Sequence, residues 1–240
     1  MSIAILSDIH GNLEAAREVF RDMDAHQPEA VFFLGDAIGY GPDPEGAVQL
    51  LKQRGALCVL GNHELALVRR RARRYFNKPT RRHFDHVKSM LSRDSRKFVA
   101  TWPSRRESGD LLFVHGCPPG SVVTYLVEMG DKELAAALRR MDAAIAFVGH
   151  THELEIAELR EGSLERRVPG PGRHHLTGDK TVVNIGSVGQ PRDGDKRAKY
   201  ALFDPRSREV EIRFVAYDAE TTARRIRERG FPEAYAERLL

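Results

Sequence analysis

Five short motifs of polar residues, each beside a glycine, carry the side chains of this sequence that are best suited to metal chemistry. Each motif follows a short apolar run, which is typical of a buried strand that ends in a loop. The motifs are Asp8-Ile9-His10, Gly35-Asp36, Gly61-Asn62-His63-Glu64, His115-Gly116 and Gly149-His150-Thr151-His152. Because loops on a rigid scaffold commonly present catalytic and metal-binding groups, these five strand ends predict one shared site.

Two of the motifs repeat the same spacing of potential ligands. Asp8 and His10 lie two residues apart on a turn, and His150 and His152 do the same at another strand end, so each pair can reach a single ion. Asp36 has two carboxylate oxygens and can bridge two ions. The pattern therefore predicts two metals held side by side.

The remaining donors complete a mixed nitrogen and oxygen set without a thiolate. Asn62 offers a neutral carbonyl oxygen and His115 a further imidazole. Such a set argues against a structural zinc site and favours Mn²⁺, Fe, Zn²⁺ or Co²⁺ in a catalytic role, because Mg²⁺ and Ca²⁺ prefer more oxygen ligands. Two metals about 4 Å apart can hold a bridging hydroxide that attacks phosphorus, so no covalent nucleophile is required.

The elements that must position these groups alternate between strand and helix in the first half of the chain. Single helices between successive strands imply βαβ crossovers and a largely parallel sheet. Asn12 is expected to cap the first helix, and Pro44 lies in the first turn of the second. The patterns predict strands at Ile3–Ser7, Ala30–Leu34, Ala56–Leu60, Leu111–His115 and Ile145–Gly149, and helices at Leu13–Ala25, Asp43–Arg54, Leu65–Phe76, Thr80–Thr101 and Lys132–Arg140.

After His152 the sequence changes to short strands at regular spacing, which predicts antiparallel hairpins that form a second sheet. Pro169–Lys180 is rich in glycine and proline and is expected to be a flexible loop, and two short helices follow Asp218. The strands are expected at Leu154–Leu159, Leu164–Val168, Thr181–Ile185, Tyr200–Asp204 and Val210–Tyr217. Two facing sheets with helices outside would align all five motifs along one rim, where open α/β sheets bind ligands.

Bulk composition is that of a soluble globular protein, with 240 residues of which 41% are hydrophobic and 30% charged. No apolar run approaches the roughly 18 residues of a membrane span, and the sequence begins directly with a strand pattern. We therefore expect a cytoplasmic protein without membrane association. Cys58 and Cys117 lie beside apolar strand residues and are interpreted as small buried side chains.

The net charge of +4 hides a strongly basic segment. Arg69 to Arg106 contains 14 Lys and Arg and only two acids, Asp85 and Asp94, so its charge is +12 and the rest of the chain sums to −8. Within a single domain of residues 1–240, we expect a helical basic cap insertion at about residues 65–107 that covers the active-site rim and attracts polyanions. A solvated basic face without a catalytic purpose is the alternative.

In this order, the five motifs resemble those of the calcineurin-like metallophosphoesterase superfamily. The resemblance extends over essentially the whole chain. It implies an α/β fold, the four-layer α/β/β/α sandwich of these enzymes, and a metal-dependent phosphoesterase that hydrolyses phosphate esters or anhydrides by a metal-activated hydroxide. It also implies two divalent metal ions, of which we favour Mn²⁺, with Fe, Zn²⁺ or Co²⁺ as alternatives.

Carried over residue by residue, the resemblance divides the ligands between the two ions and adds a general acid. His63 matches the group that protonates the leaving group or steadies the charge of the transition state. A histidine beside two cations needs a carboxylate partner to stay protonated, and whether Glu64 or another acid orients His63 is open. The first ion would take Asp8, His10, Asp36 and His152, and the second would take Asp36, Asn62, His115 and His150.

One departure from the family pattern concerns phosphate binding. Ser/Thr protein phosphatases and symmetrical diadenosine tetraphosphatases carry one arginine after the Gly-Asp pair and another directly before Gly-Asn-His-Glu, whereas Gly35–Pro42 and Val59–Glu64 contain none. Arginine is the side chain best suited to bidentate capture of phosphate. We expect Arg192 to supply this contact, and a surface salt bridge from Arg192 to Asp193 or Asp195 is the alternative.

Further substrate contacts are expected from the cap and the rim. Arg69 and Arg73 follow closely on His63, and Tyr40 offers a ring that can stack on a nucleobase. These residues favour a phosphorylated small-molecule substrate of nucleotide type, such as diadenosine tetraphosphate, and Ser/Thr protein phosphatase or cyclic-nucleotide phosphodiesterase activity is the alternative. The intact ligand set argues against a non-catalytic nucleic-acid-binding protein, which would show steep salt dependence and no turnover.

Overall fold

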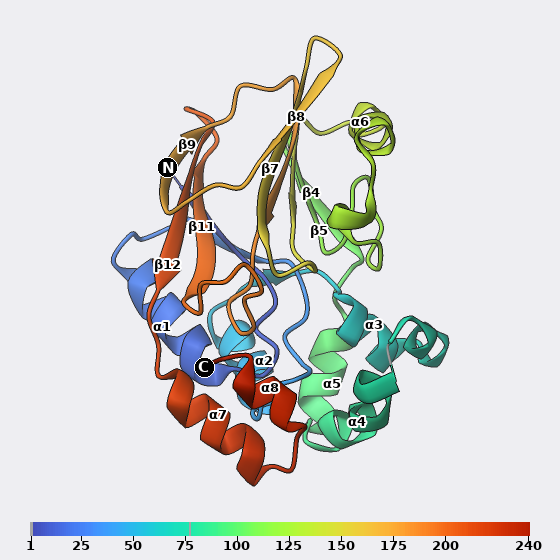
Figure 1. Ribbon diagram of the computed structural model, residues 1–240, viewed down its shortest axis with the longest axis vertical. Helices are drawn as coiled ribbons and strands as arrows, with labels where there is room; N and C mark the ends of the chain where they lie inside the picture. Colours follow the sequence, from blue (N-terminus) through green and yellow to red (C-terminus); the bar gives the residue numbers. More distant parts are fainter. Residues whose placement is uncertain (1, 77) are drawn as a thin grey trace.

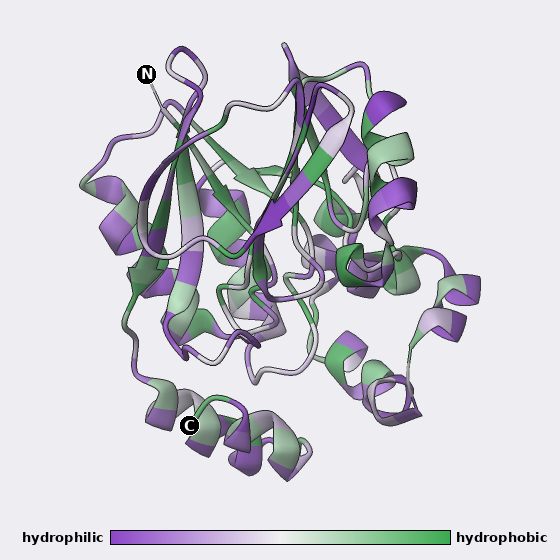
Figure 2. Cartoon of the chain, turned by 45° about the horizontal axis from the view of Figure 1, so that its top comes forward, coloured by the Kyte–Doolittle hydropathy of each residue, from purple (hydrophilic) through white to green (hydrophobic). Residues whose placement is uncertain are grey.

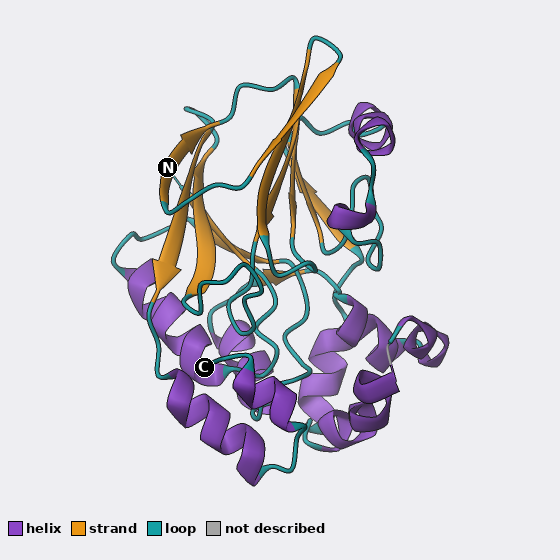
Figure 3. Ribbon diagram, in the orientation of Figure 1, coloured by secondary structure: helices purple, strands orange, loops and turns teal. Residues whose placement is uncertain are grey.

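The computed structural model describes residues 2–76 and 78–240 and shows two six-stranded β-sheets packed face to face, with helices outside them (Figures 1 and 3). The first sheet has the order β3 (Leu57–Cys58), β2 (Ala30–Phe33), β1 (Ile3–Leu6), β11 (Ala198–Asp204), β12 (Glu209–Val215) and β9 (Gly172–His175). The second has the order β4 (Arg105–Ser108), β5 (Leu111–Val114), β6 (Ile145–Val148), β10 (Lys180–Ile185), β7 (Leu154–Arg160) and β8 (Ser163–Arg167).

Helices cover the outer face of each sheet. In the first layer α1 (Leu13–Asp24) packs against β11 and β12, and in the fourth α6 (Asp131–Arg139) packs against β10 and β8. The predicted four-layer α/β/β/α sandwich is therefore confirmed. The other helical segments are α2 (Pro44–Gln53), α3 (Asn62–Val68), η1 (Arg70–Tyr75), α4 (Lys78–Ser89), α5 (Arg93–Ala100), η2 (Leu126–Glu128), α7 (Ala219–Glu228) and α8 (Glu233–Glu237).

Side chains alternate along each strand and so divide between two apolar layers. In β1, Ile5 packs between the two sheets, whereas Ala4 and Leu6 pack toward the helices. Phe32 of β2 stacks on Phe113 of β5, with ring centroids 3.8 Å apart, and so joins the sheets. Strands buried on both faces need apolar residues at successive positions, which explains the continuous apolar runs and the green colour of the inner strands in Figure 2.

The first two long helices begin where the sequence predicts. The side chain of Asn12 accepts a hydrogen bond from the backbone N–H of Ala15 at 3.1 Å, and that of Asp43 accepts one from Gly46 at 2.9 Å. Pro44 is the first residue of α2, a position where its missing N–H is not needed. These caps set where each loop ends and its helix begins, and both loops carry predicted metal ligands.

The prediction that the strands after His152 form a sheet of their own is wrong. β11 pairs antiparallel with β1, so that β11, β12 and β9 extend the first sheet, whereas β7, β8 and β10 join β5 and β6 in the second. β9 also lies inside Pro169–Lys180, where we expected a loop. Alternation of apolar residues indicates a strand but does not show with which other strand it pairs. The pairing depends on packing between segments that are distant in the sequence.

Two of the predicted helices are each divided. The expected helix Leu65–Phe76 breaks at Arg69, whose backbone is extended (φ −128°, ψ 98°), so that α3 ends before it and η1 follows. The expected helix Thr80–Thr101 breaks at Ser92, which is also extended and accepts the backbone N–H of Ser95 with its hydroxyl at 3.0 Å. A side-chain cap of this kind starts a new helix instead of continuing the old one.

The loops that carry the five motifs meet at one edge of the sandwich. β1 and β2 run parallel, as do β5, β6 and β10, so their carboxyl ends point the same way. Figure 1 shows these loops between the sheets and a group of helices, with α3, α4 and α5 on one side and α7 and α8 on the other. Across residues 2–76 and 78–240, no helix is long and apolar enough to cross a membrane.

Candidate dimetal active site

Five of the seven predicted metal ligands have a left-handed backbone, which side chains other than glycine rarely adopt. The φ angles are 56° at Asp8, 49° at His10, 61° at Asp36, 70° at His150 and 64° at His152. Such conformations persist only where the surroundings hold them, and they cluster at functional sites. Here the backbone N–H of Asp8 donates to the carbonyl of Gly35 at 3.0 Å, and that of His10 donates to Asp36 at 2.9 Å. Each strand end therefore turns sharply and brings its side chain into the site.

Two motif glycines leave room for neighbouring loops to touch. A Cβ on Gly61 would lie 2.0 Å from Oδ1 of Asp36, and a Cβ on Gly149 would lie 2.5 Å from Oδ2 of Asp8. Both distances are far below van der Waals contact, so any larger residue would displace the carboxylate. The close approach of the loops thus explains why glycine stands beside the ligands.

One group of ligand atoms combines two carboxylates and two imidazoles. Nε2 of His10 lies 3.0 Å from Nε2 of His152, and Oδ1 of Asp8 lies 3.2 Å from Nε2 of His152 and 3.5 Å from that of His10. Oδ2 of Asp36 is 3.6 Å from Nε2 of His10. All four side chains are buried. The structure thus brings together the residues that the resemblance assigns to the first ion.

A second group shares the same oxygen of Asp36. Its Oδ2 lies 3.3 Å from Nε2 of His115, and that nitrogen lies 3.1 Å from Nδ1 of His150 and 3.2 Å from Oδ1 of Asn62. These are the residues that the resemblance assigns to the second ion. Because one carboxylate oxygen belongs to both groups, two ions bound here would be neighbours.

The four histidines in these groups are oriented by backbone carbonyls on their outer sides. In each case the ring nitrogen that faces away from the ligand group bonds to a carbonyl oxygen, and this contact fixes the tautomer and turns the other nitrogen inward. The contacts are His10 Nδ1 to Ile38 at 3.0 Å, His115 Nδ1 to Leu34 at 2.8 Å, His152 Nδ1 to Gln190 at 2.7 Å and His150 Nε2 to Val123 at 3.3 Å.

The inward-facing donors fit divalent cations. With their Nδ1 atoms donating to carbonyls, His10 and His152 present two lone pairs to each other at 3.0 Å, an arrangement that a cation bound by both nitrogens would relieve. Oδ1 of Asp8 is buried and accepts no hydrogen bond from the described residues. Metal–ligand bonds of about 2.1 Å place adjacent ligand atoms about 3.0–3.4 Å apart, which matches the spacing here. The nitrogen and oxygen donors suit first-row transition metals.

Burial keeps two of these imidazoles neutral, as metal ligation requires. It lowers the pKa of His150 to about 3 and that of His152 to about 4. Burial acts in the same direction on His115, but the carboxylates of Asp36 and Asp8 outweigh it and raise the pKa of His115 to about 9. A metal at the second group therefore has to replace a proton on His115.

His63 lies beside both groups. Its Nε2 is 4.0 Å from Oδ2 of Asp36, and its ring centroid is 5.0 Å from that of His10. Burial lowers the pKa of His63 to about 3, although Asp36 opposes the shift. Its Nδ1 is buried without a hydrogen-bond partner among the described residues, and a Cβ on Gly39 would lie only 2.5 Å from it. The backbone of Gly39 thus packs against the His63 ring and leaves no room for a side chain at this position.

Glu64 joins two of the ligand-bearing loops. Its carboxylate accepts the backbone N–H groups of Asp36 at 2.7 Å, Gly61 at 3.0 Å and Ile38 at 3.2 Å. Burial and the Asp36 carboxylate raise the pKa of Glu64 to about 8, and the three N–H donors oppose the shift. The sequence left open whether Glu64 orients His63. In the structure the Glu64 carboxylate contacts the backbone of the ligand-bearing loops and not the His63 ring.

Arg192 lies next to the first group of ligands. Its backbone N–H donates to the carbonyl of His152 at 3.1 Å, its guanidinium donates to the side chain of Gln190 at 3.2 Å, and its charge helps to lower the pKa of His152 after burial. The alternative salt bridges are not formed within the described chain, because Asp193 and Asp195 pair with other cations. The half-buried guanidinium is thereby left for other contacts.

Tyr40 covers the same centre. Its ring centroid lies 4.6 Å from that of His10 and 5.1 Å from that of His63, and the ring of Tyr235 lies 5.0 Å away on its other side. The backbone of Tyr40 also has a positive φ of 30°. The residue therefore stands at the candidate site, beside His10 and His63.

Arg69 and Arg73 are placed differently. Arg69 is exposed directly after α3, and Arg73 pairs with Asp85 at 3.0 Å while its guanidinium lies over the ring of Phe84 at 4.7 Å. Phe76 connects this segment with the site, because its ring lies 4.7 Å from that of His63. In the described chain the structure does not bring either guanidinium to the metal-ligand groups.

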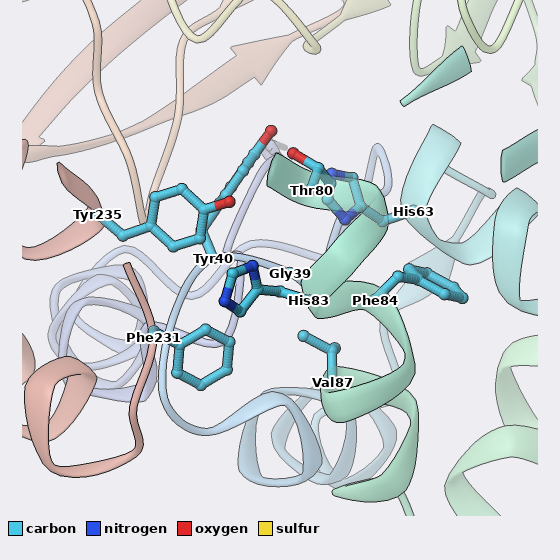
Figure 4. A pocket seen from close by; sticks show the side chains of 9 residues that line it. All are labelled: Gly39, Tyr40, His63, Thr80, His83, Phe84, Val87, Phe231 and Tyr235. Carbon is cyan, nitrogen blue, oxygen red and sulfur yellow. The ribbon is translucent and has the colours of Figure 1, made fainter. Parts of the chain in front are cut away.

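Several residues near the site escaped the sequence analysis. The ring of Tyr125 stacks on His150 at 3.8 Å, and Tyr235 contacts Tyr40 from α8. No local motif marks these residues, because each approaches from a separate element. Figure 4 shows a pocket beside His63, between α4 and the C-terminal segment, lined by Gly39, Tyr40, His63, Thr80, His83, Phe84, Val87, Phe231 and Tyr235.

Comparisons with known proteins agree with this geometry. Residues 1–208 match the model of the calcineurin-like phosphoesterase superfamily domain. An uncharacterized protein of Methanocaldococcus jannaschii is 32% identical, over 99% of this chain and 96% of the relative. A metallophosphoesterase from Sphaerobacter thermophilus is also 32% identical and has a TM-score of 0.86, over 100% of this chain and 98% of the other. A hypothetical protein from Pyrococcus horikoshii shares the fold, with 17% identity and a TM-score of 0.81 over 99% and 97% of the two chains.

The chain belongs to the calcineurin-like phosphoesterase superfamily. It is a metal-dependent phosphoesterase of a dimetal family, and clustered aspartates and histidines that can hold metal ions stand at its strand ends. The family match ends at residue 208, whereas α7 and α8, which place Tyr235 against Tyr40, follow that residue. These helices lie beyond the matched segment but within the alignments to the two relatives that are 32% identical, and α8 brings Tyr235 to the active site.

Proposed function

We propose that this phosphoesterase hydrolyses a nucleotide-type substrate, with a dinucleoside polyphosphate such as diadenosine tetraphosphate as the leading choice, and that it uses Mn²⁺ at both positions. The observation that carries the proposal is the pair of ligand groups that share Oδ2 of Asp36, next to an arginine, a tyrosine and a basic helical segment. Cations supply the charge that phosphoryl transfer needs, and the surrounding side chains select the substrate.

The ligand groups define which residues hold the ions. The first ion would be held by Asp8, His10, Asp36 and His152, and the second by Asp36, Asn62, His115 and His150. When bound, two divalent ions supply Lewis-acid activation of water and compensation of phosphoryl charge. The protein contributes the fixed geometry, because backbone carbonyls already orient all four imidazoles.

His63, Arg192 and Tyr40 act on the substrate itself. His63 presents Nε2 beside Asp36. As a neutral imidazole it donates a hydrogen bond to the leaving oxygen and so steadies the charge of the transition state. Arg192 binds phosphoryl oxygens with its half-buried guanidinium and so replaces the two arginines that the motifs lack. Tyr40 packs against the leaving group and offers its face to a base.

The basic segment favours substrates with several phosphates. Arg69 is exposed directly after α3, whose first turn carries His63, and most cations of η1, α4 and α5 are exposed with it. A cleft edged by charge of one sign raises the local concentration of oppositely charged ligands. A tetraphosphate chain that extends from the ions toward this segment gains more from it than a simple monoester does.

A substrate screen in the presence of Mn²⁺ tests the proposal. It compares dinucleoside polyphosphates, phosphopeptides, cyclic nucleotides and p-nitrophenyl phosphate, and we expect the largest kcat/KM for a dinucleoside polyphosphate. A preference for phosphopeptides or cyclic nucleotides would replace this substrate class by that of a protein phosphatase or a phosphodiesterase. Nucleic-acid binding with steep salt dependence and no turnover would contradict the enzymatic proposal altogether.

Two variants separate the roles of individual residues. His63→Asn is expected to lower kcat by about 10²–10⁴ with both metals still bound, and unchanged turnover would remove the assigned role. Arg69→Ala is expected to raise KM for the dinucleoside polyphosphate but not for p-nitrophenyl phosphate. Lys132→Ala is the matched control, because it removes an exposed cation from α6, and it should change neither constant.

A further inference from the structure

Tyr125 makes a flat contact with one of the metal-binding histidines. The ring centroids of Tyr125 and His150 are 3.8 Å apart and the ring planes differ by 18°. Two residues earlier, the carbonyl of Val123 lies 3.3 Å from Nε2 of His150. The same stretch of chain thus holds the imidazole both by its face and by its outer nitrogen, while Nδ1 points to the second ligand group.

The loop that carries Tyr125 is closed on itself by hydrogen bonds. The carbonyl of Ser121 accepts the backbone N–H groups of Gly116 at 3.1 Å and Cys117 at 3.0 Å. The hydroxyl of Ser121 accepts the N–H of Thr124 at 3.1 Å and lies 2.7 Å from the hydroxyl of the same residue. Because this loop begins directly after His115, one fixed unit positions two ligands of the second ion.

The stack on His150 places Tyr125 beside the second ligand group, within electrostatic reach of the charges of the site. Burial is the main cause that raises the pKa of Tyr125 to about 12. Tyr40, Asp36 and Asp8 act in the same direction, and the charge of Arg192 opposes them. The residue is half-buried, and among the described residues no hydrogen bond to its hydroxyl is formed. A half-buried donor without a partner, on a ring that stacks on a metal-binding histidine and within electrostatic reach of Arg192, is placed to meet an anion.

We propose that Tyr125 is a substrate-contacting residue, whose hydroxyl donates a hydrogen bond to a phosphoryl oxygen while its ring holds His150 for the second ion. The assignment rests on the proposed phosphoesterase function and names a further part of its phosphate-binding site. Tyr125 and Arg192 approach from different loops and together supply donors where the motifs lack arginine. The two roles of Tyr125, hydroxyl and ring, can be separated by mutation.

The experiment uses Tyr125→Phe and Tyr125→Leu in the full-length chain. The first keeps the ring stack and removes the hydroxyl, and the second removes both. Mn²⁺ binding is measured by calorimetry and by metal analysis, and inorganic phosphate is then titrated into the Mn²⁺-loaded protein. Turnover of p-nitrophenyl phosphate is followed in parallel. Tyr75→Phe is the matched control, because it removes a hydroxyl from an exposed tyrosine of η1.

We expect Tyr125→Phe to bind two Mn²⁺ like the wild type but to lose about tenfold in phosphate affinity and in kcat/KM, the effect of one hydrogen bond to a charged group. Tyr125→Leu should in addition lose about tenfold in affinity for one Mn²⁺. The control should match the wild type in all three measurements, and circular dichroism verifies that each variant is folded.

Two outcomes would overturn the assignment. If the wild type binds phosphate and Tyr125→Phe binds it equally well, the hydroxyl does not contact the phosphoryl group. If a folded Tyr125→Leu binds both Mn²⁺ ions with wild-type affinity, the ring does not hold His150. By contrast, a wild-type protein that binds Mn²⁺ but neither binds phosphate nor hydrolyses any phosphoester would overturn the proposed function itself.

Discussion

Replacement of Glu64 by glutamine tests how the ligand-bearing loops are held together. The carboxylate accepts three backbone N–H groups, two of them on Oε2 and one on Oε1. In glutamine one oxygen becomes an NH₂ group, so at least one buried N–H faces another donor. Loss of one charge-assisted hydrogen bond and the unpaired N–H left behind cost about 1–3 kcal/mol. For a chain of this length, a loss of about 2 kcal/mol lowers Tm by about 4–8 °C.

The assay is urea unfolding of the metal-free protein at pH 8.5. This pH lies above the raised pKa of Glu64, about 8, so that the native side chain is a carboxylate in the comparison. Mn²⁺ titration of the folded variant forms the second readout, and we expect at least tenfold weaker binding because Asp36 loses the contact that fixes its backbone. Glu133→Gln, on the exposed face of α6, makes the same chemical change and should stay within about 0.5 kcal/mol of the wild type.

The reasoning fails if Glu64→Gln and Glu133→Gln unfold at the same urea concentration and bind Mn²⁺ equally well. Such a result would mean that the backbone bonds between the loops suffice without the carboxylate. A loss of stability with unchanged Mn²⁺ affinity would contradict only the link between Glu64 and the metal ligand Asp36.

Three further predictions follow from other contacts. Lys199→Met removes the buried partner of Asp193 at 2.6 Å, so we expect a loss of about 3 kcal/mol in urea unfolding and a higher KM, because the loop of Arg192 loses its anchor. The hydrogen bonds from Arg213, above all, hold the pKa of Asp22 below its ordinary value, so their stabilisation is present above about pH 4 and is lost as the pH falls further. Asp22→Asn should therefore lower the free energy of unfolding by about 1–2 kcal/mol at pH 7, and the gap to the wild type should narrow below pH 4. Chelation should abolish turnover and lower Tm, and Mn²⁺ should restore both.

The candidate ligands could be predicted from the sequence because each follows its own strand. The apolar run before Asp8, Asp36 or His150 is a local signal, and parallel strands bring their carboxyl ends to one edge whatever the rest of the fold does. Contacts between distant elements carry no such signal. Tyr125 reaches His150, and Tyr235 reaches Tyr40, only because separate segments pack together. The division of the later strands between two sheets depends on long-range packing in the same way.

The left-handed ligands show why this edge of the sandwich has to be rigid before any ion arrives. Five such residues cost about 1–2 kcal/mol each, on the order of 5–10 kcal/mol together. Beyond the last residue of β1, the loop continues to pair with the loop after β2, because the N–H groups of Asp8, His10 and Gly11 all donate across to it. At about 1 kcal/mol net for each bond, these contacts offset only part of the strain. The N–H bonds of Glu64 and the burial of the ring edges offset more, so that the loops hold the ligands in place before any ion arrives. The strain is therefore the structural counterpart of metal affinity, since a relaxed loop would direct its ligand away from the ions.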